Sequence, residues 1–466
     1  MTRIGLVVHG QPPELVGGTE RLVAGLAAAL AEAGETVEIF SGSIDWRPQF
    51  ETVRDVAGAV PVTRVHRHDL YFERWDKLAN PFVERAFLAW LEAFRPDVVH
   101  VHHWARLTDT LVRCCRANGV PVALTLHDLF ASCPRYHRVK ADLAFCTVRA
   151  EPGACRHCAP RWRFQGDAEI DASVTAFARG LREEVRAADL LLAPTAGHAT
   201  RVLGWLGLDL PVTVLPPASE PARAPAARPL GDRPAGRDVP LRAGVFGHLH
   251  ALKGVEVLLD AQAALPDPTH VEVHVWGEAP DAGTEAALRA RAGARKVVWH
   301  GAYAPADLAG APIDVAVLPT LCAESYSFAL DEACALGVPV LASDLGALAD
   351  RATPRIARFP RGDARVLAGL LARLAQQPAE RARMAAAPAP ARLDAAGHLA
   401  TLQPLYAALA ATRPQPPPAG LDRFLDEREH AFMLREAGLK ELLRSEGWED
   451  VVARLNAEND ALRRGG

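Results

Sequence analysis

Short apolar runs alternate with helical segments along most of the chain. The first run, at 4–8, is followed by an alanine- and leucine-rich helical segment at 19–33, which Gly34 ends, and by a second run at 36–40. Runs of this length predict buried strands, and their alternation with helices predicts a parallel sheet covered on both faces. Further strands of the same kind are expected at 97–101, 122–126, 190–193 and 212–215.

One break in this pattern divides the chain. Residues 220–239 are rich in Pro, Ala, Arg and Gly and show no hydrophobic periodicity, so we interpret them as a linker. The sequence therefore predicts two doubly wound α/β domains, at 1–219 and 240–395, followed by a helix at 396–412 that packs back on the first domain. Strands of the second domain are expected at 241–247, 271–276, 296–300, 315–319 and 338–342.

The last part of the chain, 413–466, has a different composition. A Pro-rich break at 413–418 precedes a charged helical tail. Large apolar residues recur at heptad spacing between 425 and 439, but Gly438 and Gly447 interrupt the pattern, which argues against a sustained coiled coil. Two interpretations stay open: helices that pack on the first domain, or an arm that binds a partner or mediates self-association.

Composition and charge narrow the function classes. At 466 residues and 49% hydrophobic content, the chain is long enough to form two domains with cores. A formal net charge of −4 gives no basis for nucleic-acid binding. The N-terminus runs directly into a strand and no apolar run approaches ~20 residues, so neither a signal peptide nor a transmembrane helix is expected. We therefore expect a cytoplasmic protein with reduced thiols, acting in the cytosol or at the inner face of the membrane.

The segment E-S-Y-S-F-A-L-D-E at 324–332 is the most informative part of the sequence. It follows a predicted strand and opens a short helix, which Gly337 ends and Pro339 cannot continue. The free N–H groups and the dipole at such a helix N-terminus bind anions such as phosphate or diphosphate. Along a helix that rises ~1.5 Å per residue, Glu324 and Glu332 would lie about 12 Å apart, too far to share one proton. We interpret them as anchors for different parts of one ligand.

This pattern resembles the donor site of retaining glycosyltransferase family four, whose members have the GT-B fold. The family shows an acid, then a second acid followed by Ala, then Gly-x-Pro-Val and a Ser-Asp-x-Gly turn. Here these elements stand at Glu324, Glu332, 337–340 and 343–346. The resemblance implies two Rossmann-like domains that face a cleft, with the donor bound mostly by the second domain and the acceptor by the first.

The resemblance also assigns roles to residues of the 324–332 segment. It implies that Glu324 lies beside the hydroxyl groups of the donor sugar and that Glu332 holds the ribose of the nucleotide. It further implies that backbone amides near Ser327 and Phe328 meet the diphosphate.

Gly17 and Gly18 follow the first predicted strand and open a helix. The pair is not a G-x-G-x-x-G motif and no acid ends the second strand, which argues against a dinucleotide cofactor. By the resemblance, the donor approaches the backbone closely at Gly18, as only glycine permits.

Lys253 and Gly254 match the family's Lys-Gly pair. The resemblance implies that Lys253 neutralises the departing diphosphate, since cations aimed at developing charge are usually the largest contribution to such a reaction. Family members often carry an Arg upstream of this pair, where this chain has His248. Either His248 takes this role, more effectively when protonated, or another cation does.

The motif T-L-H-D at 125–128 ends a predicted strand of the first domain. Ligands bind at the carboxyl ends of strands in open α/β sheets. Related enzymes place a His followed by Asp against the reacting sugar, so the resemblance implies that His127 donates to a sugar hydroxyl or to the acceptor. A general base is not required, because the departing phosphate oxygen can take the acceptor proton. His103 is a further candidate at the cleft.

Four of the eight cysteines, Cys133, Cys146, Cys155 and Cys158, lie in one segment that ends in C-x-x-C. In a reducing compartment this pattern favours tetrahedral zinc on four thiolates, with an iron–sulfur cluster or free or transiently oxidised thiols as alternatives. A subset of the family resembles this chain in carrying a cysteine-rich insertion, here at 133–165. Such a zinc would be structural, because four thiolates leave no open position. Basic and aromatic residues in the insertion suit a saccharide, a lipid-linked phosphate, an anionic membrane surface or a solvated face.

The sequence thus predicts a retaining glycosyltransferase that moves a sugar from a nucleoside diphosphate sugar to a hydroxyl acceptor. The acceptor would be a glycan, a lipid-linked molecule or a natural product, as in polysaccharide biosynthesis. His127, Lys253 and Glu324 are the predicted catalytic residues, and no metal is expected at the reacting centre. The alternatives are a sugar-nucleotide epimerase or phosphorylase on the same fold, and a weak or inactive scaffold or sugar-nucleotide sensor, which His248 in place of Arg keeps open.

Overall fold

The computed structural model describes residues 1–445 apart from 46, 48–49, 57, 68, 70–73, 220–238 and 413–424. Nearly all of the expected linker at 220–239, and much of the tail at 413–466 with Gly447, therefore lie outside the described residues. The chain forms two compact units. The first comprises Met1–Thr125, Ala172–Leu191 and Pro404–Gly466, and the second comprises Leu126–Asp171 and Leu192–Gln403.

The described residues of the first half of the chain form an eight-stranded sheet in the order β3-β4-β2-β1-β5-β6-β7-β8. Strand β1 pairs in parallel with β2 on one side and with β5 on the other, so the strand order reverses at β1. The edge strand β3 is antiparallel to β4. The strands are β1 Arg3–Val8, β2 Thr36–Ser43, β3 Thr52–Asp55, β4 Val62–His66, β5 Val98–Val101, β6 Val122–Thr125, β7 Leu190–Ala193 and β8 Thr213–Val214.

Helices connect these strands, and local sequence explains where they begin. Helix α2 starts at Asn80, whose side-chain oxygen accepts the N–H groups of Phe82 and Val83 at 3.0 and 3.1 Å. Its Phe87 then packs edge-on against Phe40 of β2. The helices are α1 Gly18–Glu32, α2 Pro81–Phe94, α3 Leu111–Ala117, α4 Asp167–Ala187, α5 Ala196–Leu206, α13 Ala395–Ala411 and α14 Leu425–Ser445.

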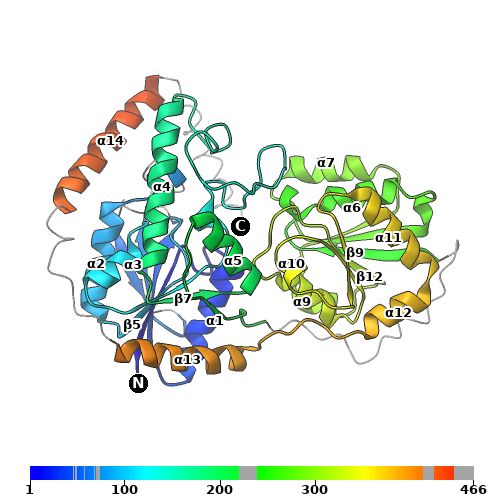
Figure 1. Ribbon diagram of the computed structural model, residues 1–466, viewed down its shortest axis with the longest axis horizontal. Helices are drawn as coiled ribbons and strands as arrows, with labels where there is room; N and C mark the ends of the chain where they lie inside the picture. The colour runs from blue at the N-terminus through cyan, green and yellow to red at the C-terminus, as the bar shows by residue number, and fades with distance from the viewer. Residues whose placement is uncertain are drawn as a thin grey trace. The chain divides into compact units, whose positions relative to one another are not determined.

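Helix α14 packs against α2 within the first unit (Figure 1). Phe432 of α14 lies edge-on against Phe82. Arg428 donates to both carboxylate oxygens of Glu84 at 2.8 and 2.9 Å. The helix runs unbroken through Gly438, since a single glycine costs a helix only about 1 kcal/mol. The described part of the tail is therefore a helix packed on the first unit.

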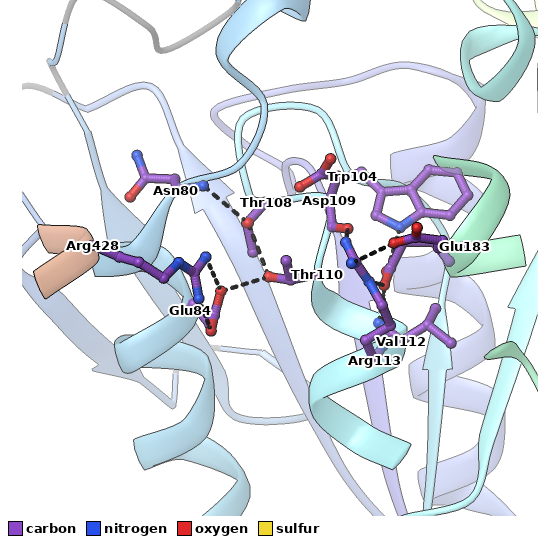
Figure 2. Close-up of polar contacts among 11 residues, drawn as sticks. Asn80, Glu84, Trp104, Thr108, Asp109, Thr110, Val112, Arg113, Glu183 and Arg428 are labelled. Atoms are coloured by element: carbon purple, nitrogen blue, oxygen red, sulfur yellow. Dashed lines mark hydrogen bonds and ion pairs between the residues drawn. The ribbon is translucent and has the colours of Figure 1, made fainter. Parts of the chain in front are cut away.

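Figure 2 shows that the Arg428–Glu84 pair continues into a buried polar network. Thr110 donates to Glu84 at 3.0 Å and lies 3.0 Å from the hydroxyl of Thr108, which in turn accepts the backbone N–H of Asn80 at 3.1 Å. The Glu84 side chain is 0% exposed, yet each of its oxygens has a donor. A buried charge is tolerated when it is paired and hydrogen-bonded in this way. The network ties α14, α2 and the start of α3 together.

The second unit contains a six-stranded sheet in the order β11-β10-β9-β12-β13-β14 among the described residues, with every pair parallel. Side chains alternate between its two faces, as a strand requires. Val245, Val273 and Val317 enter the core beneath α6, α7 and α11, whereas Phe246 and Leu318 enter the core beneath α8 and α9. The strands are β9 Leu241–Phe246, β10 Val271–Trp276, β11 Val297–Gly301, β12 Val315–Leu318, β13 Val340–Ser343 and β14 Ile356–Phe359. The helices are α6 Val255–Ala263, α7 Ala282–Ala292, α8 Pro305–Leu308, α9 Phe328–Ala335, α10 Ala347–Asp350, α11 Ala364–Gln376 and α12 Pro378–Ala386.

The predicted alternation of strands and helices is confirmed in both halves, with shifts of a few residues at the ends. The helix expected at 19–33 is α1, and Gly34 ends it with a φ of 89°. Three strands were not predicted: β3, β4 and β14. The edge strand β3 is partly exposed along its length, and β4 carries the polar residues Thr63, Arg64 and His66, so neither shows a clear apolar run. No helix in the described part of the chain is long and apolar enough to cross a membrane.

Candidate active site

Glu324 lies in the loop between β12 and α9, and its backbone is fixed by the turn that follows β13. Gly346 has a φ of 60° and approaches Glu324 so closely that a Cβ at this position would lie 2.6 Å from the Glu324 carbonyl oxygen and 2.7 Å from its nitrogen. The N–H of Ala347 donates to the same carbonyl at 2.8 Å. The glycine of the Ser-Asp-x-Gly turn is thus required by close packing, and it positions the acid.

Lys253 meets Glu324 in the second unit. The Lys253 Nζ lies 2.7 Å from Glu324 Oε1, and the attraction of Glu324 raises the pKa of Lys253, against burial. Gly254 follows with a φ of 70°, and a Cβ there would lie 2.0 Å from the carbonyl oxygen of Pro319. The Lys-Gly pair therefore needs its glycine to bring the lysine against the end of β12. The predicted cation and the first predicted acid form one ion pair.

The N-terminus of α9 has an unusual entry. Ser327 precedes the helix with a φ of 72°, a left-handed conformation that is rare for a residue other than glycine, and its side chain does not cap the helix. Arg351 secures this entry: it donates to the carbonyl of Tyr326 at 3.1 Å and to Asp331 at 2.6 Å, and its guanidinium stacks on the Tyr326 ring. Strained backbone of this kind is concentrated at ligand sites. The N–H groups of Phe328 and Ala329 open α9 and have no partner within the helix, whereas that of Leu330 donates to the Ser327 carbonyl at 3.2 Å.

Glu332 lies on α9 beyond this N-terminus, as predicted. The hydroxyl of Tyr303 lies 3.5 Å from its Oε2, a long contact. Glu332 also acts on Lys253, whose pKa it helps to raise after the larger effect of Glu324. The structure thus brings Lys253, Glu324 and Glu332 together around the start of one helix. Arg351 and Tyr303 were missed from the sequence, because neither stands in a recognisable motif.

The two histidines upstream of Lys253 have different surroundings. His248 is exposed, whereas His250 is half-buried. The Nδ1 of His250 accepts the N–H of Leu252 at 3.2 Å, which caps the 3₁₀ turn Ala251–Lys253. Burial, reinforced by the charge of Lys253, lowers the pKa of His250 to about 4. His250 is therefore neutral at pH 7 and adds no positive charge beside Lys253.

His127 and Asp128 follow β6 after one intervening residue, Leu126, at the end of the strand where a ligand residue was predicted. His127 is half-buried, and Asp128 accepts the N–H of Phe130 at 2.9 Å. His137, from the cysteine-rich segment, is a residue whose place at this site was not predicted. Burial lowers its pKa, while Asp128 and then Glu324 oppose that shift, so His137 lies within electrostatic reach of the Lys253–Glu324 pair.

Gly17 and Gly18 lie in the first unit, at the N-terminus of α1. A Cβ on Gly17 would come within 2.5 Å of Glu20 Oε2. The Glu20 carboxylate folds back over the start of its own helix, and its position accounts for the absence of a side chain at Gly17. The predicted contact of Gly18 with a donor stays a prediction.

The cysteine-rich segment holds its four thiols near one another. The charge of Cys146 contributes to the raised pKa values of Cys133, Cys155 and Cys158, although burial is the largest cause for each. All eight cysteines are free. Within the described residues, which include these four, no group of three or more His, Cys, Asp or Glu side chains is placed to hold a metal ion. The predicted zinc site therefore stays a prediction.

Basic residues of this segment are largely used inside it. Arg138 is 1% exposed and donates to the carbonyls of Ser132 and Cys146 at 2.6 and 3.1 Å, while its guanidinium stacks on Trp205. Arg135 donates to the carbonyl of Val139 at 2.9 Å. These arginines order the segment, so they are not free to contact a membrane or a saccharide.

Comparison with known proteins identifies the family. One family model, Glycosyltransferase Family 4, matches residues 16–223, and a second, Glycosyl transferases group 1, matches residues 240–377. A D-inositol 3-phosphate glycosyltransferase from Jonesia denitrificans is 30% identical over 71% of this chain and 76% of its own length. The chain belongs to glycosyltransferase family 4. A second D-inositol 3-phosphate glycosyltransferase, from an Arthrobacter species, is 28% identical over 74% of this chain and 79% of its own length.

Solved structures support the fold of this glycosyltransferase. A sucrose-phosphate synthase from Thermosynechococcus elongatus superposes with a TM-score of 0.60 at 20% identity, covering 88% of this chain and 97% of its own. Anabaena HepE, solved in complex with UDP, superposes with a TM-score of 0.58 at 16% identity, covering 87% and 100%. The glycosyltransferase thus has the predicted GT-B fold of two parallel α/β sheets. Membership of glycosyltransferase family 4 and the enzyme class are confirmed, whereas retention, the zinc-containing subset and the roles of individual site residues stay predictions.

Proposed function

We propose that this family 4 glycosyltransferase moves a sugar from a nucleoside diphosphate sugar to a hydroxyl acceptor with retention of the anomeric configuration. The observation that carries the proposal is the arrangement of Lys253, Glu324 and Glu332 around the N-terminus of α9. A helix N-terminus and an ammonium group together attract a diphosphate. The two acids then contact the groups that flank the diphosphate in such a donor. Glu324 contacts the sugar, and Glu332 contacts the ribose.

In the proposed reaction, the bond between the anomeric carbon and the diphosphate oxygen breaks. Negative charge develops on that oxygen, where Lys253 and the amides near Ser327 and Phe328 stabilise it. The acceptor oxygen bonds to the anomeric carbon on the face that the diphosphate leaves. Its proton passes to the departing phosphate oxygen, so the configuration is retained without a protein nucleophile. His127 donates a hydrogen bond to a hydroxyl of the sugar or of the acceptor.

The comparisons suggest molecules to test as donor and acceptor. Structures of Anabaena HepE have been solved in complex with UDP and with UDP-glucose. The curated relatives are named for D-inositol 3-phosphate, a phosphorylated cyclic polyol. A uridine donor and a polyol acceptor are therefore the first pair to assay.

A nucleotide-sugar panel tests the donor half of the proposal by thermal unfolding. A ligand that binds only the folded protein at 100 times its Kd stabilises it by about 2.7 kcal/mol. We expect one nucleoside diphosphate sugar to raise the Tm, and Glu332→Ala to reduce that rise at equal ligand concentration. No rise with any uridine, guanosine or adenosine diphosphate sugar would contradict the proposal. A rise without sugar transfer would instead favour a sugar-nucleotide sensor.

We extend the proposal to a structural zinc ion in the cysteine-rich segment. Cys133, Cys146, Cys155 and Cys158 supply the thiolate donors that zinc prefers, although among the described residues no three such side chains are placed to hold a metal ion. The metal would order the segment and would take no part in sugar transfer. Elemental analysis of the purified protein should find one equivalent of zinc, and Cys155→Ser should lower it. A metal-free wild-type protein purified without chelators would contradict this part.

A further inference from the structure

A histidine–glutamate pair lies at the carboxyl end of β1 in the first unit. His9 directly follows β1, and its Nε2 lies 2.9 Å from Oε1 of Glu20 on α1. Although burial opposes it, the hydrogen bond from His9 lowers the pKa of Glu20 to about 2, so the carboxylate is ionised at neutral pH. Burial, followed by the effect of His103, lowers the pKa of His9. The imidazole is therefore neutral at pH 7, and Glu20 holds it in the tautomer whose Nε2 carries the proton.

The other ring nitrogen of His9 is left with an unused lone pair. In this tautomer Nδ1 is a hydrogen-bond acceptor. It is buried and, among the described residues, it has no hydrogen-bond partner; the same holds for Nε2 of Gln11, a donor two residues further along the loop. Buried polar atoms in folded proteins are nearly always paired. An acceptor and a donor at the end of one strand suit a hydroxyl group, which both donates and accepts.

The position of the pair in the sheet is that of a ligand site. The strand order reverses at β1, and open α/β sheets bind ligands outside the carboxyl ends of the strands at such a point. His103, which follows β5 on the neighbouring side, brings its ring centroid to 4.4 Å from that of His9. Its Nδ1 accepts the N–H of Ala105 at 3.0 Å, so the ring is fixed.

The backbone around His9 is also constrained. Arg106 has a φ of 60°, in the left-handed region that non-glycine residues rarely occupy. A Cβ on Gly42 would lie 2.8 Å from the His9 carbonyl oxygen and 3.3 Å from the Arg106 Cβ. Close packing of this kind fixes where His9 stands, as a binding residue requires.

We propose that His9, oriented by Glu20, binds a hydroxyl of a polyol acceptor beside the reacting one, with Gln11 as the neighbouring donor. The inference rests on the proposed function and names a substrate class, polyhydroxylated molecules such as sugars and cyclitols, for its acceptor half. The His9 lone pair accepts the hydrogen bond of this neighbouring hydroxyl and so positions the acceptor. The reacting hydroxyl keeps its own proton, which passes to the departing phosphate oxygen as in the reaction above.

The second unit offers a matched control. His274 Nε2 also lies 2.9 Å from a glutamate, Oε1 of Glu272, and His274 is buried, whereas His9 is half-buried. There, however, Nδ1 lies 3.0 Å from Nε2 of His300. The two histidine–glutamate pairs have the same distance and differ in whether Nδ1 of the histidine has a hydrogen-bond partner. The same substitution in each pair therefore distinguishes a structural role of the histidine from a role in ligand binding.

The experiment compares His9→Gln with His274→Gln, because glutamine retains a donor near the position of Nε2 and removes the Nδ1 lone pair. Release of UDP from UDP-glucose is measured with water alone and with D-inositol 3-phosphate, myo-inositol, glucose and glycerol, and UDP-glucose affinity by calorimetry. We expect a polyol to accelerate release by the wild type, and His9→Gln to lower kcat/KM for that polyol about 100-fold, because an acceptor misplaced by about 1 Å loses about that much rate. UDP-glucose affinity should stay within twofold, and His274→Gln should leave both unchanged.

Each other outcome has a defined meaning. Equal polyol kcat/KM in wild type and His9→Gln would overturn the role of His9. Wild-type protein that binds and hydrolyses UDP-glucose but is not accelerated by any of the polyols would overturn the acceptor class. Absence of binding to UDP-glucose and to the other nucleotide sugars would instead defeat the proposed function. Equal losses in His9→Gln and His274→Gln, matched by equal falls in Tm, would mean that His9 only stabilises the fold.

Discussion

Replacing Lys253 by Met tests whether the charge of this residue acts in catalysis or only stabilises the fold. The side chain of Lys253 is 33% exposed and that of its partner Glu324 is 19% exposed, with 2.7 Å between Nζ and Oε1. Partly exposed pairs of this kind contribute about 0–1 kcal/mol to folding, because solvent screens them and ordering two side chains costs entropy. The methylene stem of Lys is closely matched by Met, so little packing is lost.

The effect on turnover should be much larger. Loss of one group that stabilises developing negative charge costs about 2.7–4 kcal/mol, or a factor of about 10²–10³ in kcat. The variant also leaves the Glu324 carboxylate uncompensated beside the diphosphate, and two like charges at ~4 Å repel by up to about 4 kcal/mol at a protein surface. Lys253→Met should therefore impair kcat by at least about 10²-fold, whereas Lys253→Met with Glu324→Gln should recover part of the loss in donor affinity.

The assay pairs initial rates of nucleoside diphosphate release with urea unfolding for each variant. Lys296 supplies the control, because its Nζ lies 2.5 Å from Glu272 in the same unit and its side chain is 61% exposed. The changes in initial rate and in unfolding free energy caused by Lys296→Met should each be no more than a few tenths of the change caused by Lys253→Met. Wild-type turnover in Lys253→Met, or a loss of stability large enough to account for the lost rate, would refute the reasoning.

Three further predictions concern the support of the site and the fold. Gly346→Ala should abolish donor binding and lower Tm, because the added Cβ meets the Glu324 backbone at 2.6 Å; calorimetry with UDP-glucose measures this, and Gly369→Ala, in open space on a helix, is the control. Arg428→Met should lower the free energy of unfolding by about 3 kcal/mol, since it leaves the buried Glu84 carboxylate without its cation. In urea unfolding, the double variant Arg428→Met with Glu84→Gln should recover much of that loss. If the unfolding free energy of the single variant equals that of the wild type within error, α14 is not held by this pair. The lowered pKa of His250, about 4 against an ordinary 6.5, means that the unfolded chain takes up a proton first, so stability should fall as pH drops from about 6.5 to about 4; His250→Asn, which keeps a capping acceptor, should flatten that slope, and an unchanged slope would contradict the assignment.

The sequence predicted most of the fold because its signals are local. Apolar runs bounded by glycine and proline marked the parallel strands, and the segment from Glu324 through α9 and β13 to the turn at Gly346 was recognisable as a motif. The same locality explains what was missed. Arg351 stands outside every motif, and only the tertiary fold brings its guanidinium to Asp331 and the Tyr326 carbonyl.

The His9–Glu20 pair and the placement of His137 were missed from the sequence for the same reason. His9 and Glu20 lie on a strand end and on a helix, and their spacing in sequence indicates nothing until the helix folds back beside the strand. His137 belongs to the cysteine-rich segment, where a lone histidine has no distinguishing pattern. Long-range contacts of polar side chains are set by tertiary packing, which hydrophobic periodicity does not report.

The central claim, retaining transfer from a nucleoside diphosphate sugar, is tested most directly by following the reaction with NMR. Wild-type protein would be mixed with UDP-glucose and D-inositol 3-phosphate, and the anomeric protons recorded over time. We expect stoichiometric formation of UDP and of a glycoside with the α configuration of the donor, and neither product with Lys253→Met over the same period. A β-configured glycoside, or a donor that binds and is not consumed with any polyol acceptor, would contradict it.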